Sequence, residues 1–323
     1  MKKRNLLLGA AAAGTALYTG LCALLFHEIF HKDATIPGKI FQSSQKKSRD
    51  PDEQPKQKDP REVWLHEQDV QDCRIEGVGG HTLTAHYIPA AAESDRWVLC
   101  SHGYRSRGMR EFRLIAKFYH DAGYHVLMVD HRASGDSEGK FITFGKIESE
   151  DLLRWLDWIR TTHNAQARVI LHGISMGAAT VMMLSDRAEI LPNVKFIVAD
   201  CGYTSVENQF GSVLEGAHIP HRALIGSVSA INRAVSGFPF RDVEPHAHVQ
   251  HAVVPMLFIH GDADNFVPTR MSIENYEACC TEKALVLING AAHAESYPTD
   301  SATYENAVKQ FMDRYMDAEP TAK

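Results

Sequence analysis

One stretch, residues 168–180, constrains the fold of this chain more than any other. Residues 169–171 have the apolar character of a buried strand, and a helical pattern begins at Ala178. Between them lies Gly-Ile-Ser-Met-Gly, centred on Ser175. A sharp strand-to-helix turn of this kind holds the serine in a strained backbone conformation with its hydroxyl projecting. The helix places free N–H groups beside that hydroxyl, which suits a nucleophile whose reaction creates an oxyanion.

The two glycines of this turn, Gly173 and Gly177, leave room where a side chain would collide with neighbouring backbone. By itself, a G-x-S-x-G pattern also occurs in glycine-rich turns that have no catalytic role. The nucleophile interpretation of Ser175 therefore depends on its context: the strand before it, the helix after it, and two partners further along the chain.

Those partners are a carboxylate and a histidine, the groups that activate a serine nucleophile. The motif His-Gly-Asp-Ala-Asp ends at Asp264 and follows one apolar strand, and Gly-Ala-Ala-His ends at His293 and follows the next. Taken singly, Asp264 would be interpreted as a residue that caps a loop, and His293 as a surface histidine. Their joint placement after successive strands, in the order Ser175, Asp264, His293, favours the catalytic triad of an α/β-hydrolase.

Strands and helices alternate through most of the chain. Short apolar runs at 97–100, 126–129, 169–171, 196–199, 256–259 and 284–288 are separated by helical patterns. This alternation predicts an α/β fold with a mostly parallel, doubly wound sheet, whose active groups gather at the carboxyl ends of the strands. Alternating apolar and polar residues at 70–78 and 82–88, around two glycines, predict an N-terminal antiparallel hairpin.

With these motifs, residues 61–316 resemble the α/β-hydrolase superfamily. The motifs are His-Gly-Tyr ending at Tyr104, Gly-Ile-Ser-Met-Gly, His-Gly-Asp-Ala-Asp-Asn-Phe-Val-Pro, Gly-Ala-Ala-His, and the loop 130–137. Ala133 stands where that loop usually has a glycine, a departure that concerns the loop and not the triad. Within the superfamily the sequence is similar to membrane-anchored bacterial hydrolases described as prolyl-oligopeptidase-like or serine-aminopeptidase-like.

The resemblance implies a role for each site residue. Ser175 attacks the substrate, His293 moves the proton, and Asp264 orients His293. The backbone N–H groups of Met176 and Tyr104 hold the oxyanion. Two alternatives stay open for Tyr104, since its hydroxyl could donate instead, or its ring could simply form a wall of the pocket. This chemistry requires no metal and no organic cofactor.

Two other carboxylates compete for the role of the triad acid. Asp262 lies two residues before Asp264, whereas the resemblance places the acid four residues after His260. Asp200 ends the strand after the nucleophile helix, and some relatives use that site. Motif spacing favours Asp264. His102 is expected to order the oxyanion loop without transferring a proton.

Two neighbouring segments bear on substrate selection. Between residues 205 and 243 the strand–helix alternation stops, which predicts a small helical lid; an ordinary helical crossover without a gating role is the alternative. Arg105, Arg107 and Arg110 follow the oxyanion motif, where they would favour an anionic substrate. Solvated loop charges are the simpler interpretation of these arginines, because isolated surface charges contribute little.

The first sixty residues carry a different signal. Three basic residues precede a charge-free run at 6–26, about 21 residues or roughly 31 Å as a helix. This predicts a membrane anchor at 1–30 with a cytoplasmic N-terminus and an extracytoplasmic catalytic domain. A cleaved signal peptide and a secreted protein are the alternative. Residues 31–60 are expected to form a polar tether, because 43–60 lack aliphatic and aromatic residues; the hydrolase domain then spans 61–323.

Composition narrows the function further. A net charge of −6 argues against nucleic acid as the main partner, and the six scattered cysteines have no metal-ligand spacing. We therefore expect a serine hydrolase that cleaves an ester, thioester or amide of a small acyl or peptide substrate through an acyl-enzyme. The alternatives are a peptidase of the serine-aminopeptidase type and a non-catalytic, membrane-tethered binding module on a hydrolase scaffold.

Overall fold

An eight-stranded sheet runs through the chain in the order β1-β2-β4-β3-β5-β6-β7-β8. The computed structural model describes residues 2–34, 59–216, 218 and 221–317, with the backbone alone for residues 2–13. The strands are β1 (Gln71–Glu76), β2 (Thr82–Ile88), β3 (Arg96–Ser101), β4 (His125–Val129), β5 (Arg168–Ile174), β6 (Val194–Asp200), β7 (Met256–Gly261) and β8 (Lys283–Ile288). The pairs β1–β2 and β2–β4 are antiparallel and all others parallel, which confirms the predicted, mostly parallel sheet.

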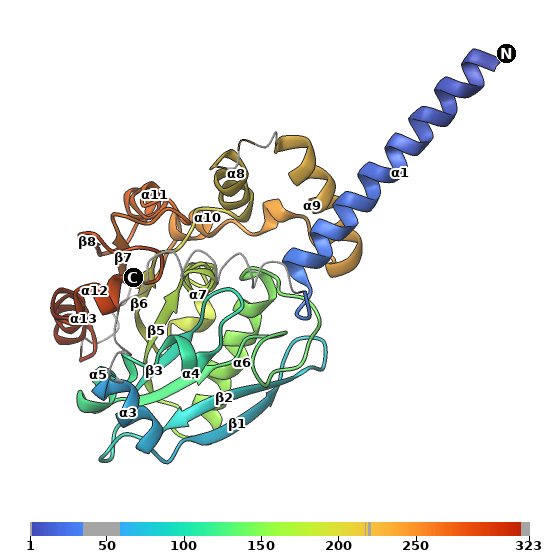
Figure 1. Ribbon diagram of the computed structural model, residues 1–323. Coiled ribbons are helices and arrows are strands. Elements are labelled where there is room, and N and C mark those ends of the chain that lie inside the picture. The colour runs from blue at the N-terminus through green and yellow to red at the C-terminus, as the bar shows by residue number, and fades with distance from the viewer. Residues whose placement is uncertain (1, 35–58, 217, 219–220, 318–323) are drawn as a thin grey trace, which may run out of the picture.

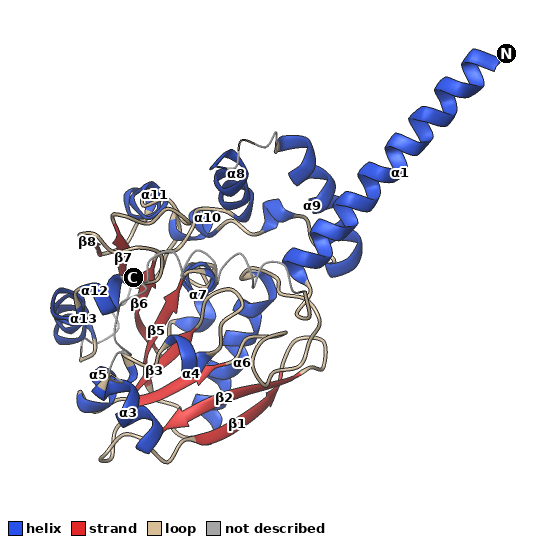
Figure 2. Ribbon diagram, in the orientation of Figure 1, coloured by secondary structure: helices blue, strands red, loops and turns tan. Residues whose placement is uncertain are grey.

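Helices cover both faces of this sheet (Figure 1 and Figure 2). One face packs on α6 (Lys146–Thr162), α7 (Met176–Met182), α10 (Pro245–Val249) and α11 (Arg270–Ala278). The other packs on α3 (Pro60–Glu67), α5 (Ala116–Asp121) and α13 (Ser301–Tyr315). The short elements α4 (Gly108–Glu111), α12 (Ser296–Thr299) and η1 (Ala188–Ile190) lie in the connections.

The strands are apolar at nearly every position because both faces of the sheet are covered. In β3, Trp97 and Leu99 belong to one apolar cluster and Val98 and Cys100 to the other. Successive side chains of a strand point to opposite faces, so both sets must be apolar. The parallel strands bring the carboxyl ends of β3, β5, β6, β7 and β8 to one edge of the sheet, where the site residues lie.

The N-terminal segment is one long helix, α1 (Lys2–Phe30), which projects from the body and lies beside α9 (Arg222–Ser236) near its C-terminal end (Figure 1). Cys22, Phe26 and Phe30 are buried in a third apolar cluster. Within the described parts of the chain, no helix combines the length and the apolar character that crossing a bilayer requires. The transmembrane helix predicted within residues 1–30 is therefore not confirmed, and most of the predicted tether, at 35–58, lies outside the described residues.

The segment predicted as a lid contains α8 (Val206–Gly216), α9 and η2 (Phe240–Asp242). Val228 of α9 and Phe240 of η2 pack with Phe30 of α1 in the third apolar cluster. The same cluster contains Met176, the residue directly after Ser175. This segment and the end of α1 therefore lie beside the nucleophile turn, whereas a lid movement and the domain boundary at residue 61 stay predictions.

The turn around Ser175 is as tight as its glycines predict. A Cβ added to Gly177 would lie 1.8 Å from the carbonyl oxygen of Ser101 in β3. A Cβ added to Gly173 would lie 2.1 Å from the carbonyl oxygen of Gly177. Since both clashes are with backbone, the start of α7 reaches this depth against β3 only without a side chain at these positions.

We expect Gly177→Ala to lower the free energy of unfolding by about 3 kcal/mol or more, because β3 or α7 must shift to admit the methyl group. Gly226→Ala in α9 is the matched control, since nothing lies within 4 Å of its added Cβ. That change should be neutral or stabilising by about 0.5–1 kcal/mol, because alanine favours the helix. Urea unfolding of the full chain measures both, and equal midpoints for the two variants would contradict this account of the turn.

Candidate active site

Ser175 occupies a strained turn between β5 and α7. Its backbone has φ 58° and ψ −115°, in the left-handed half of conformational space that a residue with a side chain rarely adopts. The N–H of Ser175 donates a hydrogen bond of 2.8 Å to the carbonyl oxygen of Asp200, which ties the turn to the end of β6. The predicted strained serine is therefore present, and the side chain is only 7% exposed.

A chain of hydrogen bonds runs from this serine to a buried carboxylate. The Oγ of Ser175 lies 2.8 Å from Nε2 of His293, although 118 positions separate the two residues. The Nδ1 of His293 lies 2.7 Å from Oδ2 of Asp264. Because a carboxylate accepts the Nδ1 proton, Nε2 is left to accept the proton of the Ser175 hydroxyl. The structure thus brings together the three side chains that the sequence order suggested.

Asp264 is held as an anion by the groups around it. Its Oδ1 accepts hydrogen bonds from the N–H groups of Phe266 and Val267 at 2.8 and 2.9 Å. Its Oδ2 accepts from His293 and also from Nε2 of His260 at 3.1 Å. Burial opposes ionisation, but the hydrogen bonds from His260 and His293 prevail and hold the pKa of the carboxyl well below its usual range. The loop that follows β7 therefore presents a fixed negative charge to His293.

The two competing carboxylates have other partners. Asp262 is exposed and accepts a hydrogen bond of 2.6 Å from the N–H of Gly290, which braces the loop that leads to His293. Asp200 accepts from the Ser296 hydroxyl at 3.0 Å, and burial raises the pKa of its carboxyl to about 6. Of the three carboxylates, Asp264 is the one hydrogen-bonded to Nδ1 of His293.

The loop after β3 lies directly against the nucleophile. A Cβ added to Gly103 would lie 3.4 Å from Cβ of Ser175. His102 shapes this loop, since its Nδ1 donates to the carbonyl oxygen of Gly103 at 2.7 Å and its Nε2 accepts from the N–H of His131 at 3.0 Å. Burial lowers the pKa of His102, so its ring is neutral and both nitrogens are engaged in ordering the loop.

Tyr104 has its hydroxyl directed to the N-terminal helix. The hydroxyl donates to the carbonyl oxygen of Ile29 at 2.6 Å and accepts from Nε of Arg105 at 2.7 Å. Its ring packs against Phe144, with 5.1 Å between the centroids. The hydroxyl proton is therefore donated to α1, which disfavours the use of this hydroxyl as an oxyanion donor.

Arg105 differs from the solvated loop charge that the sequence suggested. Its guanidinium donates to four carbonyl oxygens at the end of α1, those of Glu28, His31, Lys32 and Ala34, at 2.8–3.3 Å. Arg107 and Arg110 are exposed, as expected. No sequence pattern links residues 28–34 to position 105, so this contact could be found only in three dimensions.

The sequence also did not single out Cys201, which follows β6. One ligand atom each of Cys201, Asp264 and His293 lies within 4.8 Å of the others, a spacing that a metal ion would accept. Burial, and then the nearby carboxylates of Asp200 and Asp264, raise the pKa of the Cys201 thiol well above its usual value. Cys201 is fully buried beside the triad, where its protonated thiol packs as a neutral neighbour of Asp264 and His293.

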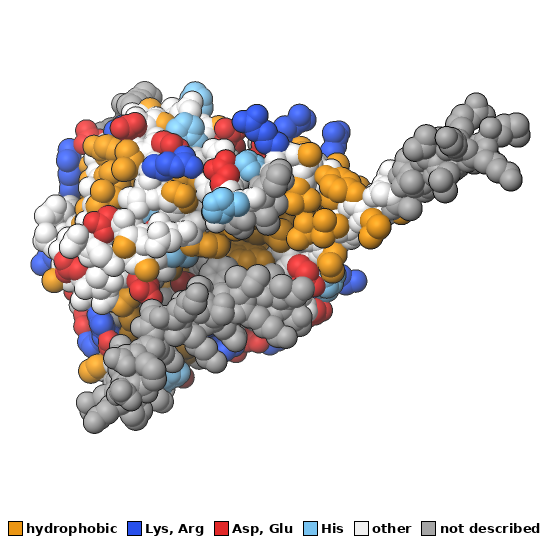
Figure 3. Space-filling model, turned by 45° about the horizontal axis from the view of Figure 1, so that its top comes forward, with side chains coloured by type: hydrophobic (Ala, Val, Ile, Leu, Met, Phe, Trp, Pro, Cys, Tyr) orange, Lys and Arg blue, Asp and Glu red, His pale blue; other side chains and the backbone are white. Residues whose placement is uncertain are grey.

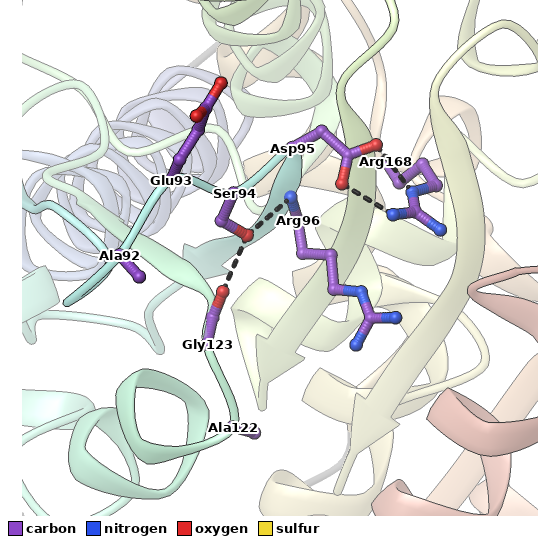
Figure 4. A pocket seen from close by; sticks show the side chains of 8 residues that line it. All are labelled: Ala92, Glu93, Ser94, Asp95, Arg96, Ala122, Gly123 and Arg168. Carbon is purple, nitrogen blue, oxygen red and sulfur yellow. Dashed lines mark hydrogen bonds and ion pairs between the residues drawn. The ribbon is translucent and has the colours of Figure 1, made fainter.

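A polar depression of about 310 Å³ lies at the other end of the sheet (Figure 4). It is lined by residues 92–96 together with Ala122, Gly123 and Arg168, at the amino ends of β3 and β5. Two of its charged groups are paired with each other, since Asp95 and Arg168 form two hydrogen bonds of 2.6 and 2.8 Å. This depression is therefore separate from Ser175, which lies at the carboxyl end of β5.

Comparisons with known proteins agree with this fold. The protein YqkD of Bacillus subtilis (strain 168) is 27% identical over 240 residues, which are 74% of this chain and 78% of YqkD. The lysophosphatidylserine lipase ABHD12 of Danio rerio is 27% identical over 166 residues, 50% of this chain and 41% of that protein. The esterase Pf2001 of Pyrococcus furiosus has the same fold, with a TM-score of 0.63 at 22% identity over 83% of this chain and 100% of that one.

A family model covers the larger part of the chain. Residues 32–237 match the peptidase family S15, described as X-Pro dipeptidyl-peptidase. The matched part contains Ser175 and ends before Asp264 and His293, so the geometry of those two residues is an independent observation. The chain belongs to the S15 peptidase family within the α/β-hydrolase superfamily, and it is a hydrolase.

Proposed function

We propose that this protein is a serine hydrolase that cleaves carboxylic esters, and related thioesters or amides, through an acyl-enzyme. The observation that carries the proposal is the unbroken hydrogen-bond chain from Ser175 through His293 to the buried carboxylate of Asp264. In the proposed reaction, Oγ of Ser175 attacks the substrate carbonyl while its proton passes to Nε2 of His293. The fixed charge of Asp264 stabilises the imidazolium that results.

Attack on the carbonyl creates an oxyanion that needs fixed donors beside Ser175. We assign this role to the N–H of Met176, at the start of α7, and to the N–H of Tyr104, on the loop that lies against Ser175. His293 then gives its proton to the leaving group, and water repeats the sequence to release the acid. Loss of one such donor typically lowers turnover roughly 10²- to 10³-fold.

Peptide hydrolysis is the second candidate, and the match to the S15 family favours it. Both activities use the same acyl-enzyme, so the leaving group alone separates them. Cleavage of p-nitrophenyl esters in preference to X-Pro amides would support the esterase, and the reverse preference would support the peptidase. A binding module without activity would neither react with a fluorophosphonate nor hydrolyse any of these substrates.

We also propose that α8 and α9 act as the lid, and that residues 1–30 attach the protein to the cell membrane with the hydrolase domain outside. The nearly complete burial of Ser175 supports the lid, because a substrate can reach it only if covering side chains move. The charge-free run at 6–26 behind three basic residues supports the attachment. Membrane fractionation with N-terminal sequencing tests it, since a new N-terminus in the medium would indicate a cleaved, secreted protein.

Ser175→Ala should abolish fluorophosphonate labelling and lower ester turnover about 10⁴-fold or more, because no other group replaces Oγ in this chain of hydrogen bonds. Ser185→Ala is the matched control, since Ser185 is also buried and its Oγ has no hydrogen-bond partner among the described residues. In-gel fluorescence and initial rates on p-nitrophenyl esters of rising chain length give the readout. Persistent labelling of the Ser175 variant would rule out the proposed nucleophile.

Asp264→Asn should reduce turnover about 10⁴-fold, because an amide cannot hold His293 in the tautomer that accepts the Ser175 proton. Asp200→Asn should reduce it by less than about ten-fold, since Asp200 is bonded to Ser296 rather than to His293. Steady-state kcat values of the two variants, with intact folding checked by circular dichroism, compare the two residues. The opposite ranking would reassign the triad acid to Asp200.

The same two carboxylates, Asp200 and Asp264, should make the free energy of unfolding depend on pH in opposite directions. The pKa of Asp200 is raised from 3.8 to about 6, so the folded state binds its proton more tightly than the unfolded state does. Its stabilising contribution is complete below about pH 4 and is lost as the pH rises through about 6, by about 3 kcal/mol at most. Asp264 has a lowered pKa, so its contribution is present at neutral pH and is lost as the pH falls.

Urea unfolding at pH 4 and pH 8 measures these contributions. Relative to the unsubstituted protein, Asp200→Asn should gain stability from pH 4 to pH 8, because asparagine removes a buried charge that forms only at the higher pH. Asp264→Asn should change little relative to the unsubstituted protein between these two pH values, because the contribution of Asp264 is lost only as the pH falls below about 4. If the free energy of unfolding of Asp200→Asn, relative to the unsubstituted protein, is the same at pH 4 and pH 8, the raised pKa of Asp200 is contradicted.

A further inference from the structure

The outer side of α1 exposes a strip of leucines that no part of the described chain covers. Leu17, Leu21 and Leu24 are spaced for one face of a helix and are 77%, 48% and 53% exposed. Beside them lies α9, to which the Tyr18 hydroxyl is hydrogen-bonded through the carbonyl oxygen of Ala223 and Oγ of Ser227. Figure 3 shows hydrophobic side chains gathered where α1 leaves the body. We call this surface, formed by the three leucines and the exposed side of α9, the α1–α9 face.

The charges of the α1–α9 face differ from those of the rest of the protein. The chain carries a net charge of −6, yet α9 contains no acidic residue and exposes Arg222 and Arg233. The sequence of α1 has no acidic residue before Glu28 and begins with Lys2, Lys3 and Arg4. An exposed apolar strip on α1 beside a helix whose charged residues are all basic is complementary to a bilayer surface that contains anionic lipids. A protein partner would require no such separation of charge.

The inner side of the same helix reaches the nucleophile. Cys22, Phe26 and Phe30 of α1 are buried in the apolar cluster that also holds Met176, next to Ser175. Phe30 stacks on Phe240, with 5.3 Å between the ring centroids. The exposed and buried sides of α1 are about one helix diameter, roughly 10 Å, apart, so the helix that carries the exposed leucines also contributes to the apolar cluster beside Ser175.

We infer that the α1–α9 face docks on an anionic phospholipid bilayer, and that the ester substrate is a lipid taken from that bilayer. The first part rests on the exposed leucines and the arginines. The second part rests also on the proposed hydrolase function. On this proposal, an acyl chain that enters between α1 and α9 meets the apolar cluster that also contains Met176, the residue next to Ser175.

The test uses the full chain and two variants. Leu21→Asp changes the α1–α9 face, and Leu191→Asp changes a position outside it. The two leucines are equally exposed, at 48%. Flotation with vesicles of phosphatidylcholine and phosphatidylglycerol measures binding. The rate on a phospholipid in those vesicles is divided by the rate on soluble p-nitrophenyl acetate. Leu21→Asp should lower the bound fraction and this ratio roughly ten-fold or more, and Leu191→Asp should change neither.

Two results would overturn the proposed docking surface. One is wild-type protein that does not float with these vesicles. The other is a Leu21→Asp variant that floats with vesicles and acts on them like wild type. Vesicles of phosphatidylcholine alone should bind less, because they lack the negative charge that Arg222 and Arg233 would meet. Failure of the proposed function gives a different result. In that case wild type floats but hydrolyses neither p-nitrophenyl acetate nor the phospholipid.

The contact between Arg105 and α1 is a separate observation. It points to Arg105 as a residue that positions the loop after β3. Its guanidinium donates to carbonyl oxygens in the last turn of α1 and just after it, where the negative end of the helix dipole favours a cation. Its backbone has φ 56°, and the preceding residue, Tyr104, donates to the carbonyl oxygen of Ile29. The end of α1 therefore fixes the backbone of the loop that supplies the proposed oxyanion donor at Tyr104.

Arg105→Met should lower kcat on p-nitrophenyl acetate roughly ten-fold or more with little change in KM, because a misplaced donor weakens binding of the transition state alone. Arg105→Lys should recover part of kcat, and Arg107→Met, at an exposed position on the same loop, should match wild type. If Arg105→Met does not fold, Tyr104→Phe removes one of the same contacts to α1. An unchanged kcat in whichever variant folds overturns the assignment, whereas failure of wild type on this ester refutes the proposed hydrolase instead.

Discussion

The carboxylate of Asp264 has to remain charged in a place from which water is excluded, and much of the site follows from that requirement. A buried anion is tolerable only if donors surround it. Two backbone N–H groups of its own loop and the rings of His260 and His293 supply them. His260 is itself fixed by the Ser272 hydroxyl at 2.6 Å, so the end of β7, the loop and α11 form one unit. The orientation of His293 depends on this unit, and so does the hydrogen bond between His293 and the Ser175 hydroxyl.

The sequence was sufficient for those features that depend on residues close together in the chain. The tight turn after β5 needs glycine at positions 173 and 177, because a Cβ at either position would collide with backbone, so the motif could be recognised from the sequence. Asp264 and His293 could be selected since each directly follows an apolar strand, and parallel strands end at a common edge. Ala133 in the loop 130–137 is a further local feature. Its φ of 58° explains why that loop usually has a glycine at this position.

Other features depend on which distant segments meet, and no local pattern encodes that. Arg105 looked like a solvated charge because the carbonyl oxygens that accept from it belong to residues 28–34. Cys201 looked like an ordinary core cysteine because its neighbours, Asp264 and His293, come from two other strand ends. The apolar run of α1 suggested a separate anchor, whereas Phe26 and Phe30 belong to the core beside the nucleophile. A protein shortened to start at residue 61 would therefore lack part of that core.

The site also has a particular order of assembly in time. Ser175 directly follows a central strand, β5, and is synthesised 118 positions before its proton acceptor, which follows the last strand of the sheet. A ribosome-bound chain can pair β3, β4 and β5 while the segment with His293 is still inside the exit tunnel. Such an intermediate holds an unactivated hydroxyl, and so does any fragment cut short by proteolysis before β8. The spacing of the three residues thus confines reactivity to chains that have been completed.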